Sequence, residues 1–364
     1  MSPAGGSLTD LLMTRRVVIC CGSGGVGKTT TAAALALAAA RAGRRAVVVT
    51  IDPARRLADA LGLEGLTNSP SIINGNWPGE LYALMLDTES TFNGLVAKYA
   101  GSQEQADKIL ANRFYRNISG ALSGTQEYMA TEKLFELYEE TDFDLIVVDT
   151  PPTRNALDFL EAPNRLARFL DHRLYRLLTA PTRGIVKAVN VAAQGFLRSV
   201  GKVVGGEVIA DAIAFFVAFE GMDEGFKDRA KRVDRLLGSD ETAFVLVASP
   251  RADTVEEASF FAGKLSEHHI TVEALVVNRM HPDPGAGNPL ADRKRAETFA
   301  GTTLGNLYTA LADLRTVAQG EAEHLADLSE RIAPAPVQRV PLLPFEVCDL
   351  DTLTRFGDVL LDSR

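Results

Sequence analysis

Short apolar runs recur along the chain, and polar or turn-forming residues bound each of them. The runs cover residues 16–21, 46–51, 81–86, 145–149, 243–248 and 272–278. Runs of this kind, bounded by turn residues, are typical of strands buried on both faces of a parallel sheet. A further short extended segment is expected near Leu342 and Leu343.

The segments between these runs favour helices. Residues 29–42 are rich in alanine and are followed by Gly43, which predicts a packed helix with a glycine stop. Together with the runs on either side, this helix makes a strand–loop–helix–strand unit. The pattern therefore predicts an α/β fold with a doubly wound, mostly parallel sheet.

Three stretches lack a strand pattern. Residues of about 88–140 and 158–236 carry apolar positions spaced three and four apart, so we expect helical insertions there. Both insertions belong to one domain that spans residues 15–364. Residues 1–14 are small and polar with a short apolar patch, and we expect a flexible N-terminal arm.

Composition narrows the class of protein. The 364 residues are 46% hydrophobic, enough for a core, and the net charge of −9 does not favour nucleic acid as a partner. The three cysteines, Cys20, Cys21 and Cys348, include no Cys-x-x-Cys pair, so neither a disulfide framework nor a zinc site is expected. No secretory signal is visible, and the longest apolar stretch, 208–219, is too short to span a bilayer, so we expect a cytoplasmic protein.

A glycine-rich segment lies between the first apolar run and the first helix. It matches G-x-x-x-x-G-K-[ST] in full, in the strand–loop–helix context of a phosphate-binding loop, the P-loop of NTPases. The nucleotide-binding candidates are Gly22, Ser23, Gly24, Gly25, Val26, Gly27, Lys28, Thr29 and Thr30. Glycines let successive N–H groups point at phosphate oxygens, and the following helix adds its positive end. Lys28 is expected to reach the β- and γ-phosphates, and the Thr29 hydroxyl to ligate Mg²⁺.

Two aspartates end apolar runs at the sheet edge where ligands bind in open parallel sheets. Asp52 follows the second run and is placed to activate the attacking water, although an aspartate that caps the next helix fits equally well. Asp149 ends the run 145–149, which has the form of a Walker B strand whose aspartate holds Mg²⁺. Lys28 and Asp52 are therefore the catalytic candidates, and Thr29 and Asp149 the metal candidates.

The segments GSGGVGKTT, TIDPARRLADAL and DTPPTRNALDFL together resemble a known family. They are similar to the phosphate-loop ATPases of the arsenical-pump (ArsA-like) and tail-anchored-protein-targeting family. The resemblance extends to Asn278 and to the stretch 340–347, VPLLPFEV. It implies that Asn278 reads adenine and that Pro344, Phe345 and Glu346 belong to the adenine loop. Since no Asn-Lys-x-Asp guanine motif is present, ATP is favoured over GTP.

The chain departs from the family pattern at several positions. Ser23 stands where the family has an extra lysine that reaches across a dimer to the partner's phosphates. Arg55 replaces a histidine of the first switch, and Arg154-Asn155 replaces a Gly-His pair of the second. The thiols of the family's arsenite and zinc sites are absent, so neither ligand is expected.

The resemblance implies a Mg²⁺-dependent dimeric switch that binds and hydrolyses ATP and acts on a membrane-protein client or membrane partner. It forms either a homodimer or a heteromer with a related ATPase that keeps the lysine, and it can associate peripherally with a membrane. A regulatory subunit with little ATPase activity, favoured by Ser23, is one alternative. A ParA- or MinD-like positioning ATPase is another. Apolar residues within 196–219 either line a client groove or belong to a core or dimer interface.

Overall fold

The computed structural model describes most of the chain. It covers residues 7–52, 55–113, 125–151, 158–165, 168, 211, 214–215, 217–219 and 221–362. These residues include an eight-stranded sheet and the helices that pack on its two faces.

The sheet forms the centre of the molecule, with its strands in the order β3-β4-β2-β5-β1-β6-β7-β8. The strands are β1 (Val17–Gly22), β2 (Arg45–Thr50), β3 (Ser71–Ile73), β4 (Glu80–Met85), β5 (Leu145–Asp149), β6 (Thr242–Ala248), β7 (Val272–Met280) and β8 (Val337–Pro341). All neighbours pair in parallel except the short edge strand β3, which is antiparallel. The predicted α/β fold is confirmed. The strand expected at Leu342 and Leu343 lies just before them, and β3 was not expected.

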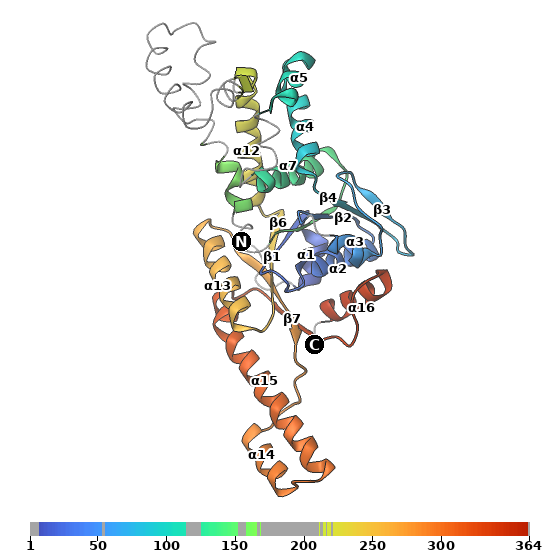
Figure 1. Cartoon of the computed structure of the whole chain (residues 1–364), viewed down its shortest axis with the longest axis vertical. Helices are drawn as coiled ribbons and strands as arrows, with labels where there is room; N and C mark the ends of the chain where they lie inside the picture. Colours follow the sequence, from blue (N-terminus) through green and yellow to red (C-terminus); the bar gives the residue numbers. More distant parts are fainter. Residues whose placement is uncertain are drawn as a thin grey trace.

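Helices cover both faces of the sheet (Figure 1). One face carries α1 (Leu8–Thr14), α2 (Lys28–Arg41), α3 (Arg56–Leu61) and α16 (Leu350–Leu361). The other carries α4 (Thr88–Tyr99), α5 (Gln103–Ala111), α7 (Thr125–Glu140), α12 (Asp223–Leu237), α13 (Ala252–Glu267) and part of α15 (Thr303–Arg331). A last helix, α14 (Pro289–Thr298), packs on α15.

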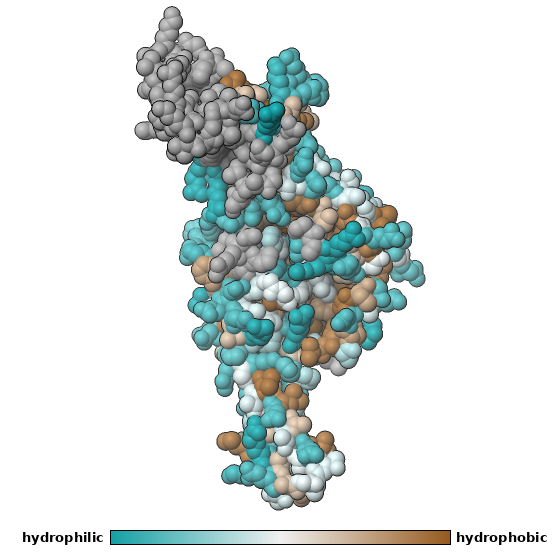
Figure 2. Space-filling model, viewed as in Figure 1, coloured by the Kyte–Doolittle hydropathy of each residue, from teal (hydrophilic) through white to brown (hydrophobic). Residues whose placement is uncertain are grey.

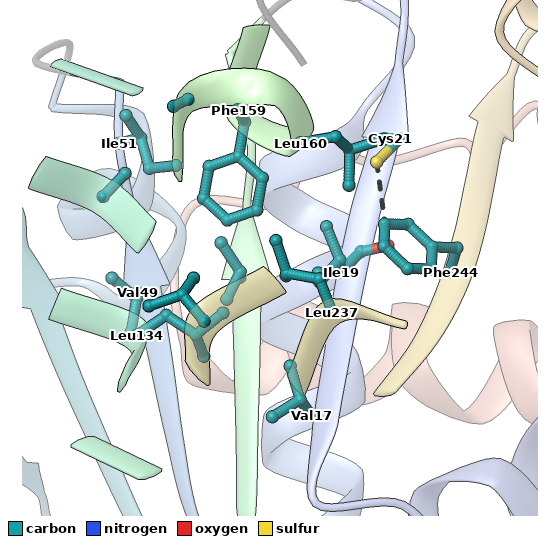
Figure 3. Packing of buried hydrophobic residues seen from close by; sticks show 14 of the residues in the cluster. Val17, Ile19, Cys21, Val49, Ile51, Leu134, Phe159, Leu160, Leu237 and Phe244 are labelled. Carbon is teal, nitrogen blue, oxygen red and sulfur yellow. Dashed lines mark hydrogen bonds between the residues drawn. The ribbon is translucent and has the colours of Figure 1, made fainter. Parts of the chain in front are cut away.

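The central strands bury side chains on both faces. Alternate residues of β1 point in opposite directions, so Cys21 joins the core on the α7 side while Cys20 joins the core on the α2 side. Figure 3 shows Ile19 and Cys21 among Phe159, Leu237 and other side chains of the first core. The two adjacent thiols therefore lie on different faces of the sheet.

The N-terminal segment differs from the expected flexible arm. Residues 8–14 form α1, and the Ser7 hydroxyl accepts a hydrogen bond from the N–H of Asp10 in a capping box. Leu8, Leu11 and Leu12 are buried in the core on the α2 side. The short apolar patch is thus one face of a docked helix.

Two helical regions extend from opposite ends of the sheet (Figure 1). Helices α4, α5, α7 and α12 form one, and the α14–α15 hairpin between β7 and β8 forms the other. Helix α15 has 29 residues, so it is about 43 Å long. Figure 2 shows a mostly hydrophilic surface on which hydrophobic side chains reappear along this hairpin. Among the described helices, none is both long enough and apolar enough to cross a membrane.

Candidate active site

The glycine-rich loop joins β1 to α2 at the carboxyl edge of the sheet. Gly27, immediately before α2, has a φ of 98°, a left-handed conformation that side chains rarely adopt. A Cβ at Gly27 would also collide with the amide of Asn278. Glycine at position 27 is therefore required both by backbone conformation and by close packing.

Lys28 is the first residue of α2 and folds back over the loop. Its ammonium group donates a hydrogen bond to the carbonyl oxygen of Ser23, at 2.7 Å. Burial lowers the pKa of Lys28, and the negative charge of Asp149 opposes that shift. The lysine thus lies inside a pocket of about 320 Å³ that Gly25, Gly27, Thr29 and other loop residues line.

Asp149 is the last residue of β5 and is 1% exposed. Its Oδ2 accepts hydrogen bonds from the hydroxyl groups of Thr29, at 2.7 Å, and Thr50, at 2.9 Å. Burial raises its pKa to about 6, although the two hydroxyl donors and Lys28 lower it. Its Oδ1 is buried and has no hydrogen-bond partner among the described residues.

These residues fit a magnesium ion. A buried carboxylate oxygen without a partner beside a threonine hydroxyl is the donor set that Mg²⁺ uses with phosphate oxygens and water. Nowhere in the described parts of the chain do three His, Cys, Asp or Glu side chains gather as ligands for one metal ion. Thr29 and Asp149, the two predicted metal ligands, lie in hydrogen-bond contact.

Asp52 follows β2 and lines the same pocket. Its side chain is 24% exposed and pairs with Arg56, with 3.5 Å between Oδ2 and Nη1. Its N–H donates to the hydroxyl oxygen of Thr50, at 3.2 Å. Asp52 therefore faces the pocket from the strand beside β5, as the sequence predicted, but it precedes α3 without capping it, since Arg55 is the N-cap.

The expected adenine-reading residues lie beyond β1, on the β7 side of the loop. The Asn278 amide donates to the carbonyl oxygen of Val26, at 2.9 Å, so in this state it braces the phosphate loop. Phe345 lies under the guanidinium of Arg355, and the pocket is lined by Val347 rather than by Pro344, Phe345 or Glu346. A role for these four residues in reading adenine remains a prediction.

Ser23 is 4% exposed and turns away from the pocket. Its hydroxyl donates to Glu257 on α13, at 2.6 Å. The position that carries the family's extra lysine thus anchors the loop to a neighbouring helix.

Sequence reasoning assigned no role to three residues around the loop. Thr50 bonds to both aspartate segments, Glu257 holds Ser23, and Arg279 donates to the carbonyl oxygen of Gly25, at 3.1 Å. Thr50 ends β2 two residues before Asp52, and this position in the sequence could have indicated a role in the site. Glu257 and Arg279 reach the loop only through tertiary packing.

Several expectations concern residues outside the described part of the chain. They include Arg154 and Asn155 and most of the apolar residues within 196–219. Of the latter, Phe219 is described, is 5% exposed and packs on Phe226 in the core on the α7 side.

Comparison with known proteins gives consistent matches. The family model described as anion-transporting ATPase matches residues 15–313. The chain is 23% identical to the ATPase asna-1 of Caenorhabditis elegans over 332 residues, which cover 88% of this chain and 85% of the relative. It is 23% identical to the ATPase get3 of Schizosaccharomyces japonicus, with 87% and 84% covered. It is 28% identical to the ATPase ARSA2 of Chlamydomonas reinhardtii, with 69% and 63% covered.

Proposed function

Because the chain belongs to the anion-transporting ATPase family and is an ATPase, we propose that it is a Mg²⁺-dependent dimeric switch whose nucleotide state controls a membrane-protein client. The observation that carries the Mg²⁺ and ATP assignment is the cluster of the buried Lys28 and Asp149 with the half-buried Thr29, in which one carboxylate oxygen of Asp149 has no partner among the described residues. Burial of an unpaired carboxylate oxygen costs folding free energy, so its retention supports a ligand-binding role.

Each side chain of the site has a separate role in ATP hydrolysis. Lys28 exchanges its bond to the Ser23 carbonyl for the β- and γ-phosphates, and the N–H groups at the start of α2 hold the same oxygens. Asp52 accepts a hydrogen bond from the attacking water and orients it. Thr29 and Asp149 would hold Mg²⁺, which neutralises charge on the β- and γ-phosphates when bound.

A chain of contacts connects the site to the helices on one side of the sheet. The Gln126 amide on α7 donates to the carbonyl oxygen of Ile51, next to Asp52, at 2.8 Å. Farther along α7, the buried Glu132 pairs with Arg229 of α12. A shift of the segment after β2 therefore acts on α7 and α12, which supports coupling between nucleotide state and the helical region.

The client class rests on the resemblance to the tail-anchored-protein-targeting branch. The two helical regions provide surfaces on which a partner can dock, and the region that contains α7 and α12 is the one linked to the segment after β2. We propose a membrane-protein segment as the client of these helices.

Ser23 favours a heteromer with a related ATPase that supplies the missing lysine. A serine side chain is uncharged and so brings no cation to a partner's phosphates, and here its hydroxyl donates to Glu257 instead. The same observation favours a second candidate, a regulatory subunit that binds ATP with little turnover of its own.

Turnover of Mg²⁺-ATP by the purified protein over a range of protein concentrations tests this proposal, with Lys28→Ala as the negative control. Turnover per mole that rises with concentration supports a competent homodimer. Tight ATP binding with negligible turnover at every concentration supports the regulatory subunit or a heteromer. Absence of ATP binding by the wild-type chain, or equal binding by Lys28→Ala, contradicts the proposal.

A further inference from the structure

Arg279 occupies an unusual place on the β7 side of the phosphate loop. The pairing of β7 with β8 shifts register between Val277 and Met280, so Asn278 and Arg279 form an irregularity in the ladder. Such irregularities re-aim side chains beside active sites. Arg279 has a φ of 63°, a left-handed conformation that residues with side chains adopt rarely.

Asn278 and Arg279 donate hydrogen bonds to two successive carbonyl groups of the phosphate loop. The Asn278 amide donates to Val26, at 2.9 Å, and the Arg279 guanidinium donates to Gly25, at 3.1 Å. The N–H of Arg279 also donates to the Asn278 side-chain oxygen, at 2.9 Å. These bonds hold both side chains against the backbone of the loop.

Arg279 also lines the nucleotide pocket. Asp52 and Asp149 lie where the γ-phosphate is attacked, and both are on one side of β1, since Asp52 follows β2 and Asp149 ends β5. Arg279 belongs to β7, two strands beyond β1 on the other side, which puts about 19 Å of sheet between β2 and β7. The part of the pocket that Arg279 lines is therefore left for the nucleoside.

The charge and the planar shape of the Arg279 guanidinium suit it to stack on a planar aromatic ring. Arg56, another cation of the pocket, pairs with Asp52, whereas no carboxylate in the described part of the chain pairs with Arg279. A guanidinium is planar and stacks on aromatic faces. Its bond to Gly25 fixes the position of the plane.

From this geometry we propose that Arg279 is a nucleotide-contacting residue whose side chain packs against the purine ring of the bound nucleotide. The proposal rests on the proposed function, since it takes ATP as the ligand. It assigns to Arg279 a base-binding role distinct from the phosphate contacts of Lys28.

Calorimetric titration with ATP, ADP and inorganic tripolyphosphate tests this role, because tripolyphosphate has no base. We expect Arg279→Ala to weaken ATP and ADP about fivefold, the effect of a cation–ring contact at an exposed site, and to leave tripolyphosphate within about twofold. Arg279→Lys keeps the charge and loses the plane, so its affinity for ATP is expected between those of wild type and Arg279→Ala. Arg339→Ala on β8 removes the same charge from an exposed position near the loop's edge of the sheet and serves as the matched control.

Two results would overturn the inference. An Arg279→Ala variant that binds ATP like wild type shows that the ring makes no such contact. Equal losses for ATP and tripolyphosphate show that Arg279 acts on the phosphates or only on the shape of the loop. Failure of the wild-type chain to bind ATP overturns the proposed function itself, whereas binding that is insensitive to Arg279 overturns this inference alone.

Discussion

The ends of β5 and β2 place two aspartates in opposite environments, Asp52 on the wall of the nucleotide pocket and Asp149 behind Thr29. Asp149 is 1% exposed, and two hydroxyl groups fix its Oδ2. The Asp52 side chain is 24% exposed and pairs with Arg56 on the following helix. A fixed, desolvated carboxylate suits a cation that stays in place, whereas a solvated one suits a water molecule that must react.

The difference follows from where each residue stands on its strand. Asp149 is still within β5, paired with Cys20 of β1 and Thr50 of β2, so strands flank it on both sides. Asp52 lies two residues beyond the end of β2, in the connection to α3. A residue in a connection keeps the freedom to follow the nucleotide, and a residue inside the sheet does not.

The substitution Asp52→Asn tests the contrast between the two aspartates most directly. The amide oxygen of asparagine still accepts a hydrogen bond but lacks the charge and basicity of the carboxylate, so turnover is expected to fall about a thousandfold. ATP affinity should stay within about threefold, because the phosphate contacts come from the loop. Single-turnover hydrolysis and calorimetric titration measure the two quantities.

Asp59→Asn is the matched control, since Asp59 also lines the pocket and lies on α3. It removes the same charge without touching the proposed water contact. A similar fall in turnover for both variants would show that charge near the pocket, rather than the Asp52 carboxylate itself, limits the reaction.

The second test concerns how much the burial of the charged Asp149 side chain lowers the free energy of unfolding. Burial raises its folded-state pKa to about 6, above the unfolded value of about 3.9, so the folded state holds its proton more tightly. In the absence of nucleotide and Mg²⁺, stability should therefore fall as pH rises from about 4 to about 6, by about 3 kcal/mol once the carboxylate is charged.

Asp149→Asn should lose this pH dependence and exceed wild type in stability at pH 7. Urea unfolding of both proteins at pH 4.5 and pH 7 measures the difference. If the gap between the two proteins is the same at both pH values, the buried carboxylate is not the titrating group. The variant should also lose Mg²⁺-stimulated turnover, because it lacks the ionised metal ligand.

The sequence predicted most of this site because its signals are local. Apolar runs ending in glycine or aspartate located β1, β2 and β5, and the spacing of the glycine-rich motif placed Lys28 and Thr29 at the start of a helix. Strand order within a parallel sheet then brings the ends of these runs to one edge.

The features that the sequence did not predict depend on tertiary contacts. The three-residue strand β3 has too few positions to show a hydrophobic pattern. Helix α1 is only two turns long, and it is held in place because Leu8, Leu11 and Leu12 are buried in the core on the α2 side. Similarly, nothing near Ser23 in sequence indicates Glu257, which is 234 residues away.

The smallest expected effect comes from Thr50, which joins the two aspartate segments. Its hydroxyl donates to Asp149 and accepts from the N–H of Asp52. Thr50→Val has nearly the same shape and removes both bonds, so it withdraws one of the two hydroxyl donors that favour the ionised form of Asp149. One such bond contributes about 1 kcal/mol, so the Mg²⁺ concentration for half-maximal turnover should rise about fivefold.

Thr50→Ser keeps the hydroxyl and should behave like wild type in the same Mg²⁺ titration. If serine and valine shift the Mg²⁺ dependence equally, loss of the hydroxyl has no specific effect, and any change in packing at this position disturbs the site. If only valine shifts it, one hydroxyl transmits the state of the buried carboxylate to the backbone of Asp52. The fixed and the solvated aspartate would then act as one unit despite their different environments.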